Sequence, residues 1–264
     1  MAKMDKAFAY HDAVMRLLQR VRDEELPALE KAVDLCTEAI ASDGLVHLFG
    51  SGHSSMMCEE MTPRQGTFVG WHTIKEQAVT HHTNIVGQNA LRQVLHLEKT
   101  PGYAKSILDN FQFGPKDVMF IISTSGIREL IVEMALESRR RGLQVIALLS
   151  REHCRQARAC HPSGKKLIDL ADVVIDNKSP VGDCVTPVTG TSQRTGPVST
   201  LTVAMAMNLI RAQVAEDLVQ RGKPPILLPS HQFAEAGEVE AALERYYAAH
   251  ARALARLLTG DRRY

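Results

Sequence analysis

The sequence predicts an α/β fold: a three-layer sandwich on a mainly parallel, five-stranded sheet, with helical extensions at both termini. Two observations lead to this prediction. Short apolar runs alternate along the chain with segments whose apolar residues recur at helical spacing. The runs at 117–122 and 143–149 are almost wholly apolar, as is typical of strands buried on both faces of a parallel sheet. Strands that alternate with helices form right-handed crossover units, which place the strands side by side in parallel.

The first half of the chain begins with a helix expected over residues 5–41. Pro27 should kink or divide this helix because proline lacks the amide hydrogen that an interior turn needs. The next elements, in order, are a strand at 45–49, a helix that runs to Met61 and a second strand at 67–71. Residues 72–100 show no clear pattern.

In the second half of the chain, the alternation of predicted helices and strands is clearer. The expected elements are helix 101–110, strand 117–122, helix 128–141, strand 143–149, strand 171–175, helix 197–221 and helix 235–258. Gly142 should end the 128–141 helix, since glycine readily adopts the left-handed conformation found there. Residues 177–196 are rich in glycine, proline, serine and threonine and are expected to be loop.

Composition narrows the class of protein. The 264 residues suit one domain with helical additions. With 31 basic and 30 acidic residues, the net charge of +1 calls for neither nucleic acid nor an anionic membrane as partner. No secretory signal and no apolar run of about 18 residues is seen. The five cysteines fit reduced thiols, so a cytoplasmic location is expected.

Two loops rich in hydroxyl groups and glycine stand between a predicted strand and a predicted helix. Because the carboxyl ends of parallel strands share one edge of a sheet, the two loops should lie together where ligands bind. Glycine amides, serine and threonine hydroxyls and the positive end of a helix suit a phosphate dianion, and an arginine beside them could add a charge-assisted hydrogen bond. The candidate phosphate-binding residues are Ser51, Gly52, Ser54, Ser55, Ser123, Thr124, Ser125, Gly126 and Arg128.

Other uses of these loops are less well supported. The first loop lacks the third glycine of the dinucleotide-binding GxGxxG motif, and no Walker A loop is present. Either loop alone could be a strand–helix turn capped by hydroxyl groups, but two at equivalent positions favour a site. No cofactor and no metal are expected: His153-Cys154 and Cys160-His161 lack the usual spacing of zinc ligands. His81-His82 could reach a neighbouring subunit's site, bind a metal or belong to a polar loop.

The second loop and its surroundings resemble the central signature of the SIS (sugar isomerase) domain family. The resemblance lies in Asp117–Gly126 and, after a helix, Arg141–Leu148. Gly50–Ser54 resembles the first loop of those domains, with Ser54 at their phosphate-binding serine. The resemblance covers about residues 5–245 and extends to an uncharacterised bacterial SIS family related to phosphoheptose isomerase.

This resemblance implies a flavodoxin- or Rossmann-like fold that binds a phosphorylated sugar. It implies one SIS domain over residues 1–264, with a core at 45–221 and helical extensions at 5–41 and 222–264. SIS domains associate through long apolar helices, so a homodimer or tetramer is expected, with the site near the interface. They usually carry serine or threonine where Arg128 stands. The 197–221 helix lacks the histidine that phosphoheptose isomerase uses.

Aldose–ketose isomerisation through an enediol needs a base and an acid. The Glu59–Arg64 segment resembles one in phosphoheptose isomerase whose second glutamate is catalytic, which implies Glu60 as the base. The interval from the loop serine to this residue is about one helical turn shorter here. His53 in the first loop and Glu98 are the candidate partners; the alternative for each is a solvated or locally packed side chain.

The leading predicted function is therefore an aldose–ketose isomerase acting on a sugar phosphate. One alternative is a non-catalytic phosphosugar sensor, although the residues before the first strand show neither a helix-turn-helix pattern nor a basic excess. Another is a lyase or deaminase that uses the same base to expel a group from a substituted sugar phosphate.

Overall fold

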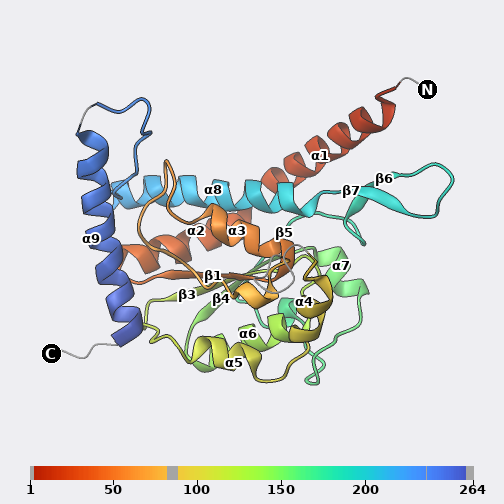
Figure 1. The fold of residues 1–264 in the computed structure, drawn as a ribbon, viewed down its shortest axis with the longest axis horizontal. Helices are drawn as coiled ribbons and strands as arrows, with labels where there is room; N and C mark the ends of the chain where they lie inside the picture. Colours follow the sequence, from red (N-terminus) through yellow and green to blue (C-terminus); the bar gives the residue numbers. More distant parts are fainter. Residues whose placement is uncertain (1–2, 82–88, 236, 260–264) are drawn as a thin grey trace.

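The computed structural model describes residues 3–81, 89–235 and 237–259. At its centre lies a five-stranded sheet of order β2-β1-β3-β4-β5, with every neighbouring pair of strands parallel (Figure 1). The strands are β1 (Val46–Gly50), β2 (Trp71–Thr73), β3 (Val118–Ile122), β4 (Gln144–Leu149) and β5 (Val173–Asp176). Helices cover both faces of the sheet, which confirms the predicted three-layer architecture.

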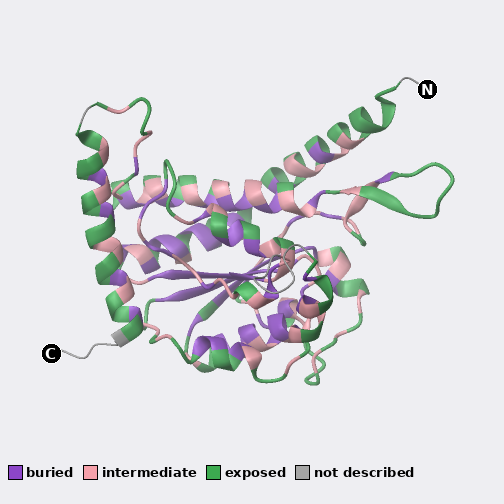
Figure 2. Ribbon diagram, in the orientation of Figure 1, coloured by how far each residue is buried: buried purple, intermediate pink, exposed green. Residues whose placement is uncertain are grey.

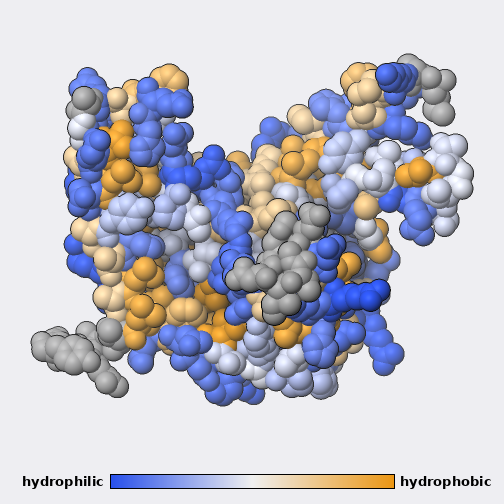
Figure 3. Space-filling model, viewed as in Figure 1, coloured by the Kyte–Doolittle hydropathy of each residue, from blue (hydrophilic) through white to orange (hydrophobic). Residues whose placement is uncertain are grey.

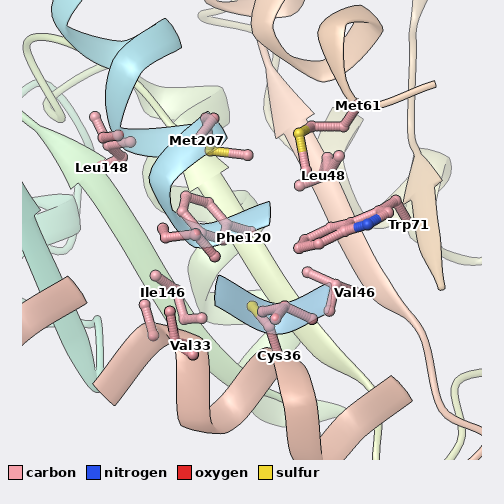
Figure 4. Packing of buried hydrophobic residues seen from close by; sticks show 14 of the residues in the cluster. Val33, Cys36, Val46, Leu48, Met61, Trp71, Phe120, Ile146, Leu148 and Met207 are labelled. Carbon is pink, nitrogen blue, oxygen red and sulfur yellow. The ribbon is translucent and has the colours of Figure 1, made fainter. Parts of the chain in front are cut away.

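One face of the sheet packs against the long helices. These are α1 (Asp5–Glu24), α2 (Leu26–Ala41) and α8 (Ser199–Gln220), with the short α3 (Ser55–Glu60) beside them. Alternate strand residues such as Leu48 and Phe120 point to this face and contact Met207 and its neighbours (Figure 4). The intervening residues, such as Met119 and Ile121, belong to a second buried cluster. Because both faces are covered, β3 is apolar at every position.

The second cluster lies under helices on the opposite face. They include α5 (Tyr103–Leu108) and α6 (Glu129–Arg140), whose apolar stripe of Leu130, Ile131 and Met134 is fully buried. The short helices α4 (Leu91–Leu97) and α7 (Arg151–Gln156) lie toward the carboxyl ends of the strands (Figure 1).

The N-terminal helix divides at Glu25, as predicted from Pro27, which lies in the first turn of α2, where its missing amide hydrogen costs nothing. Other elements differ from the sequence-based expectation. The second strand is Trp71–Thr73 rather than 67–71, because its pairing with β1 begins at Trp71, opposite Val46. The segment without a clear pattern contains the rest of β2, a 3-10 turn at Gln77–Val79 and α4.

Residues 177–196 are not simply loop. Two short strands, β6 (Cys184–Pro187) and β7 (Arg194–Pro197), pair there as an antiparallel hairpin. The hairpin and the N-terminal part of α1 project from the body and are largely exposed (Figure 2). Tyr10 of α1 donates a hydrogen bond from its hydroxyl to the backbone oxygen of Pro197 (3.0 Å), which ties the two together.

The last helix, α9 (Glu238–Thr259), lies across the end of the sheet away from the hairpin (Figure 1). Ala253 and Leu257 of this helix are buried against Leu45, just before β1. Over residues 3–81, 89–235 and 237–259, no helix is long and apolar enough to cross a membrane.

A buried polar cluster lies at the amino end of β1. The Nε2 atom of His47, which is fully buried, lies 3.1 Å from Oδ2 of Asp117, and its Nδ1 lies 2.9 Å from Nδ1 of His72. Asp117 also accepts hydrogen bonds from the backbone amides of Leu45 (2.8 Å) and Gly114 (2.7 Å). Burial, and then the neighbouring His47, lower the pKa of His72 to about 3.

This pKa predicts a loss of stability in mild acid. His72 stays neutral in the folded chain, whereas in the unfolded chain it takes up a proton near pH 6.5. Below that pH the unfolded state binds more protons, so this residue lowers the free energy of unfolding by about 2 kcal/mol at pH 5. Urea denaturation between pH 7.5 and 5 measures the slope. His72→Gln should flatten it, and His11→Gln, at an exposed histidine, should not. An unchanged slope in His72→Gln contradicts the prediction.

Candidate functional site

A cavity of about 390 Å³ opens at the carboxyl ends of β1 and β3. The strand order reverses between these two strands, which is where parallel sheets bind ligands. Gly50 pairs with Ile122 in the register of β1 and β3, so the loops that follow start side by side. Many of the predicted site residues line the cavity: Ser51, Gly52, His53, Ser54, Glu98, Ser123, Thr124, Ser125 and Arg128.

The first loop turns back tightly on itself. A Cβ atom on Gly50 would lie 2.8 Å from the backbone of Ser54, and Gly52 has a φ of +56°, so glycine is required at both positions. Ser55 does not line the cavity. It is buried, and its hydroxyl donates to the backbone oxygen of Gly52 (2.7 Å), so it holds the loop in shape.

The second loop lines the cavity with Ser123, Thr124 and Ser125. Gly126, at φ +62°, lies behind the loop, and its amide donates to Oγ of Ser123 (3.2 Å), so it shapes the loop without lining the cavity. Among the described residues, the amides of Thr124 and Ser125 have no hydrogen-bond partner. The positive end of α6 follows directly. These groups form a cradle suited to an anion.

Glu98 connects both loops and two helices. Its carboxylate is buried; Oε1 accepts a hydrogen bond from the Ser51 hydroxyl (2.5 Å), and Oε2 lies 3.7 Å from Nε of Arg128. Its backbone oxygen accepts from the amide of Leu130 (2.9 Å), in the first turn of α6. The carboxylate is therefore held in one place, beside one hydroxyl and one cation. In such a position it can take a proton from a bound molecule.

Three histidines line the cavity. His53 is exposed, and its ring lies edge-on to that of His81 with the ring centroids 4.6 Å apart. His82, the other member of the histidine pair in the sequence, lies outside the described residues. His153 of α7 also lines the cavity, and its Nδ1 atom is buried without a hydrogen-bond partner in the part of the chain that the structure describes. Sequence reasoning considered His153 only as a zinc ligand.

Sequence reasoning also missed the part of the wall formed near the hairpin. Asp183 accepts hydrogen bonds from the amide (2.8 Å) and the hydroxyl (2.7 Å) of Ser199, which closes the N-terminus of α8 beside the cavity. Thr200 lines the same wall. The hairpin brings Asp183 and Ser199 together across fifteen intervening residues. Because this segment was interpreted as loop, the sequence did not predict that the two residues would be in contact.

Glu60, which the family resemblance implies as the base, is not among the residues that line this cavity. It is the last residue of the six-residue α3, and its carboxylate lies 2.6 Å from Nη1 of Arg64 and 3.4 Å from Nη2 of Arg211. Arg211 also donates to the backbone oxygen of Glu60 (3.0 Å), which ties this end of α3 to α8. Two arginines therefore hold the carboxylate of Glu60 at the end of α3.

The chain has clear relatives. Residues 9–150 match the SIS domain family. A UPF0309 protein of Listeria monocytogenes serotype 4b (strain CLIP80459) is 30% identical over 238 residues, which cover 90% of this chain and 94% of that protein. A UPF0309 protein of Halalkalibacterium halodurans is 35% identical over 217 residues, covering 82% and 87%. Among solved structures, phosphoheptose isomerase GmhA of Neisseria gonorrhoeae aligns with a TM-score of 0.53 at 16% identity, covering 81% of this chain and 98% of GmhA. That likeness shows the fold.

Proposed function

Because this chain belongs to the SIS domain family and to the UPF0309 proteins, we propose that it binds a phosphorylated sugar and interconverts its aldose and ketose forms. One observation carries the proposal. One cavity joins an anion cradle, in which the amides of Thr124 and Ser125 have no partner among the described residues, to a buried carboxylate, Glu98. GmhA, which shares the fold, is by its name an isomerase of a phosphosugar.

The phosphate would lie against the second loop. The amides of Thr124 and Ser125, the side-chain hydroxyls beside them and the positive end of α6 supply donors and positive potential without a further charge. Ser54 of the first loop would contribute from the other side. Arg128 adds a cation to the same cavity while it faces Glu98.

The carboxylate of Glu98 would act as the base in place of Glu60. It would take the proton from the carbon next to the carbonyl group, leaving an enediol, and return it to the neighbouring carbon. The hydroxyl of Ser51 holds one carboxylate oxygen and so orients the group for this transfer. His53, which lines the cavity, would exchange the proton of the sugar oxygen.

The phosphate assignment is tested by melting the protein with a panel of four- to seven-carbon sugar phosphates and the matching free sugars. A bound phosphosugar present at about 100 times its dissociation constant should add about 2.7 kcal/mol of stability. Ser125→Ala should lower the affinity of the protein for that phosphosugar by at least tenfold, because a hydrogen bond to a charged group is lost. Ser192→Ala, at the exposed hairpin, is the control. Equal stabilisation by the free sugar contradicts a phosphate site.

The fate of the bound phosphosugar distinguishes an isomerase from a deaminase, a lyase or a sensor. Nuclear magnetic resonance of the incubated hit would follow conversion of the aldose to the ketose. Release of ammonia or an acid from a substituted sugar would instead indicate the deaminase or lyase. Binding without any conversion would indicate a sensor. The buried carboxylate inside the cavity favours turnover, since a sensor has no need of a base.

We also propose that the chain forms a homo-oligomer in the cytoplasm. Met4, just before α1, and Phe8 and Met15 of α1 are at least half exposed, as expected of a face that another copy covers. Apolar side chains also gather where α1 meets the body, near α8 (Figure 3). The five cysteines are free thiols, in keeping with a reducing compartment.

A further inference from the structure

His153 lines the cavity, yet the proposed reaction gives it no role. It is the third residue of α7, the short helix that follows β4. Its Nδ1 atom is buried and has no hydrogen-bond partner among the described residues. Buried polar atoms are nearly always hydrogen-bonded, because an unpartnered one loses its contact with water without replacement. A histidine in this state in the wall of a cavity therefore needs an explanation.

The surroundings of the ring decide which nitrogen carries the hydrogen of the neutral imidazole. A hydrogen on Nδ1 would be buried without an acceptor. The other nitrogen, Nε2, is not buried in this way and forms no hydrogen bond within the part of the chain that the structure describes. The neutral ring therefore keeps its hydrogen on Nε2, where a molecule in the cavity can accept it. His153 thus offers the cavity one donor at a fixed atom.

The first turn of α7 is held against the second loop. The backbone amide of Ser150, the residue before α7, donates to the backbone oxygen of Thr124 (2.9 Å). Oγ of Ser150 accepts a hydrogen bond from the amide of His153 (3.2 Å), which caps the helix. A Cβ atom on Gly126 would lie 3.2 Å from Sγ of Cys154, so the loop and the helix are in close contact. The backbone of His153 is therefore fixed beside the anion cradle.

The order of the strands separates His153 from Glu98. β3, whose following loop forms the cradle, lies between β1 and β4. Glu98 is hydrogen-bonded to Ser51, which follows β1, whereas His153 follows β4. The proposed base and the imidazole donor therefore approach the cradle from different sides. A phosphate in the cradle would meet His153 on one side, while the reacting carbons would lie toward Glu98 on the other.

We propose that His153 binds the phosphate group of the substrate through the hydrogen on Nε2, next to the amides of Thr124 and Ser125. The SIS resemblance implies serine and threonine as phosphate ligands and assigns no role to this histidine. This inference rests on the proposed phosphosugar site, and it adds a residue that holds the phosphate and moves no proton.

Variants of His153 test which nitrogen acts. His153→Ala should lower the affinity for inorganic phosphate, and for the sugar phosphate that binds best in the panel, by about tenfold or more, because a hydrogen bond to a charged group is lost. His153→Gln carries an amide nitrogen about as far as Nε2 and should keep the affinity within about threefold of the parent. His153→Asn carries its amide only as far as Nδ1 and should bind as weakly as His153→Ala. Calorimetry measures the sugar phosphate directly and inorganic phosphate by displacement.

Kinetics separate binding from proton transfer. In His153→Ala, KM should rise while kcat at saturating sugar phosphate stays within about threefold of the parent, as expected when an interaction common to the ground state and the transition state is lost. His231→Ala, at an exposed histidine that does not line the cavity, should change neither quantity. If His153→Ala does not fold, the contrast between His153→Gln and His153→Asn decides.

Three results would overturn the inference and leave the phosphate site standing. They are unchanged affinity of His153→Ala for inorganic phosphate, a loss of kcat in that variant without a loss of affinity, and rescue by His153→Asn but not by His153→Gln. If the parent protein binds neither inorganic phosphate nor any sugar phosphate of the panel, the proposed function fails, and this inference fails with it.

Discussion

Replacing Glu98 with glutamine should lower kcat for aldose–ketose conversion by about 10²- to 10⁴-fold, the range expected when a general base is lost. The amide keeps the size of the side chain and can still accept from the hydroxyl of Ser51, so the cavity should keep its shape. The dissociation constant of the phosphosugar should change little, because the phosphate is held by the second loop. Turnover assays and calorimetry on the same preparation measure the two effects separately.

Glu60→Gln is the matched comparison for this experiment. It removes the carboxylate that family resemblance favours, but that carboxylate pairs with Arg64 and Arg211 outside the cavity. Turnover in this variant should stay within about threefold of the parent, a far smaller change than the loss of a general base produces. The reverse result, with activity lost in Glu60→Gln and kept in Glu98→Gln, would show that Glu98 is not the base.

Phe120→Ala should lower the free energy of unfolding by about 3–5 kcal/mol, the usual cost of truncating a buried phenylalanine. Phe120 is fully buried at the middle of β3 and packs among Leu48, Ile146 and Met207 between the sheet and the long helices (Figure 4). Losing most of this side chain leaves a cavity that the surrounding strands and helices cannot readily fill. Urea denaturation at pH 7.5 measures the change.

Two control variants test whether the loss of stability comes from the loss of buried volume at Phe120. Phe120→Leu should cost less than Phe120→Ala because it keeps most of the buried volume. Phe233→Ala, at a side chain that is 87% exposed, should change stability by less than about 0.5 kcal/mol. If Phe120→Ala proved as stable as Phe233→Ala, Phe120 would not be part of a close-packed core.

The strands at 117–122 and 143–149 could be predicted because their evidence is local. Each is a continuous apolar run, and a chain buried on both faces of a sheet needs no alternation. The hairpin of β6 and β7 could not be predicted in this way, since each strand has only four residues and no apolar run, and the hairpin is held by contacts with α1 and the start of α8. The predicted bounds of β2 were wrong for a similar reason, because they depend on its pairing with β1.

Some features of the candidate site could likewise be predicted from local sequence, and others could not. The two loops were predictable, since glycines and hydroxyl groups after a strand are readable in the sequence. Glu98 was predicted as a candidate, but its hydrogen bond to Ser51 and its place beside Arg128 were not. Glu60 was favoured by a resemblance between short segments, and such a resemblance cannot show where a helix of six residues ends in space.

By itself, the sequence determined the α/β architecture, the strands of the sheet other than β2 and the two loops at its carboxyl edge, because periodicity, glycine and hydroxyl groups act over a few neighbouring residues. Only the tertiary structure decided which carboxylate meets those loops. It placed Glu98, His153 and Asp183 around one cavity and Glu60 outside it. The physical reason is that the position of each of these side chains depends on how helices far apart in the sequence pack on the sheet. This packing is a property of the whole chain.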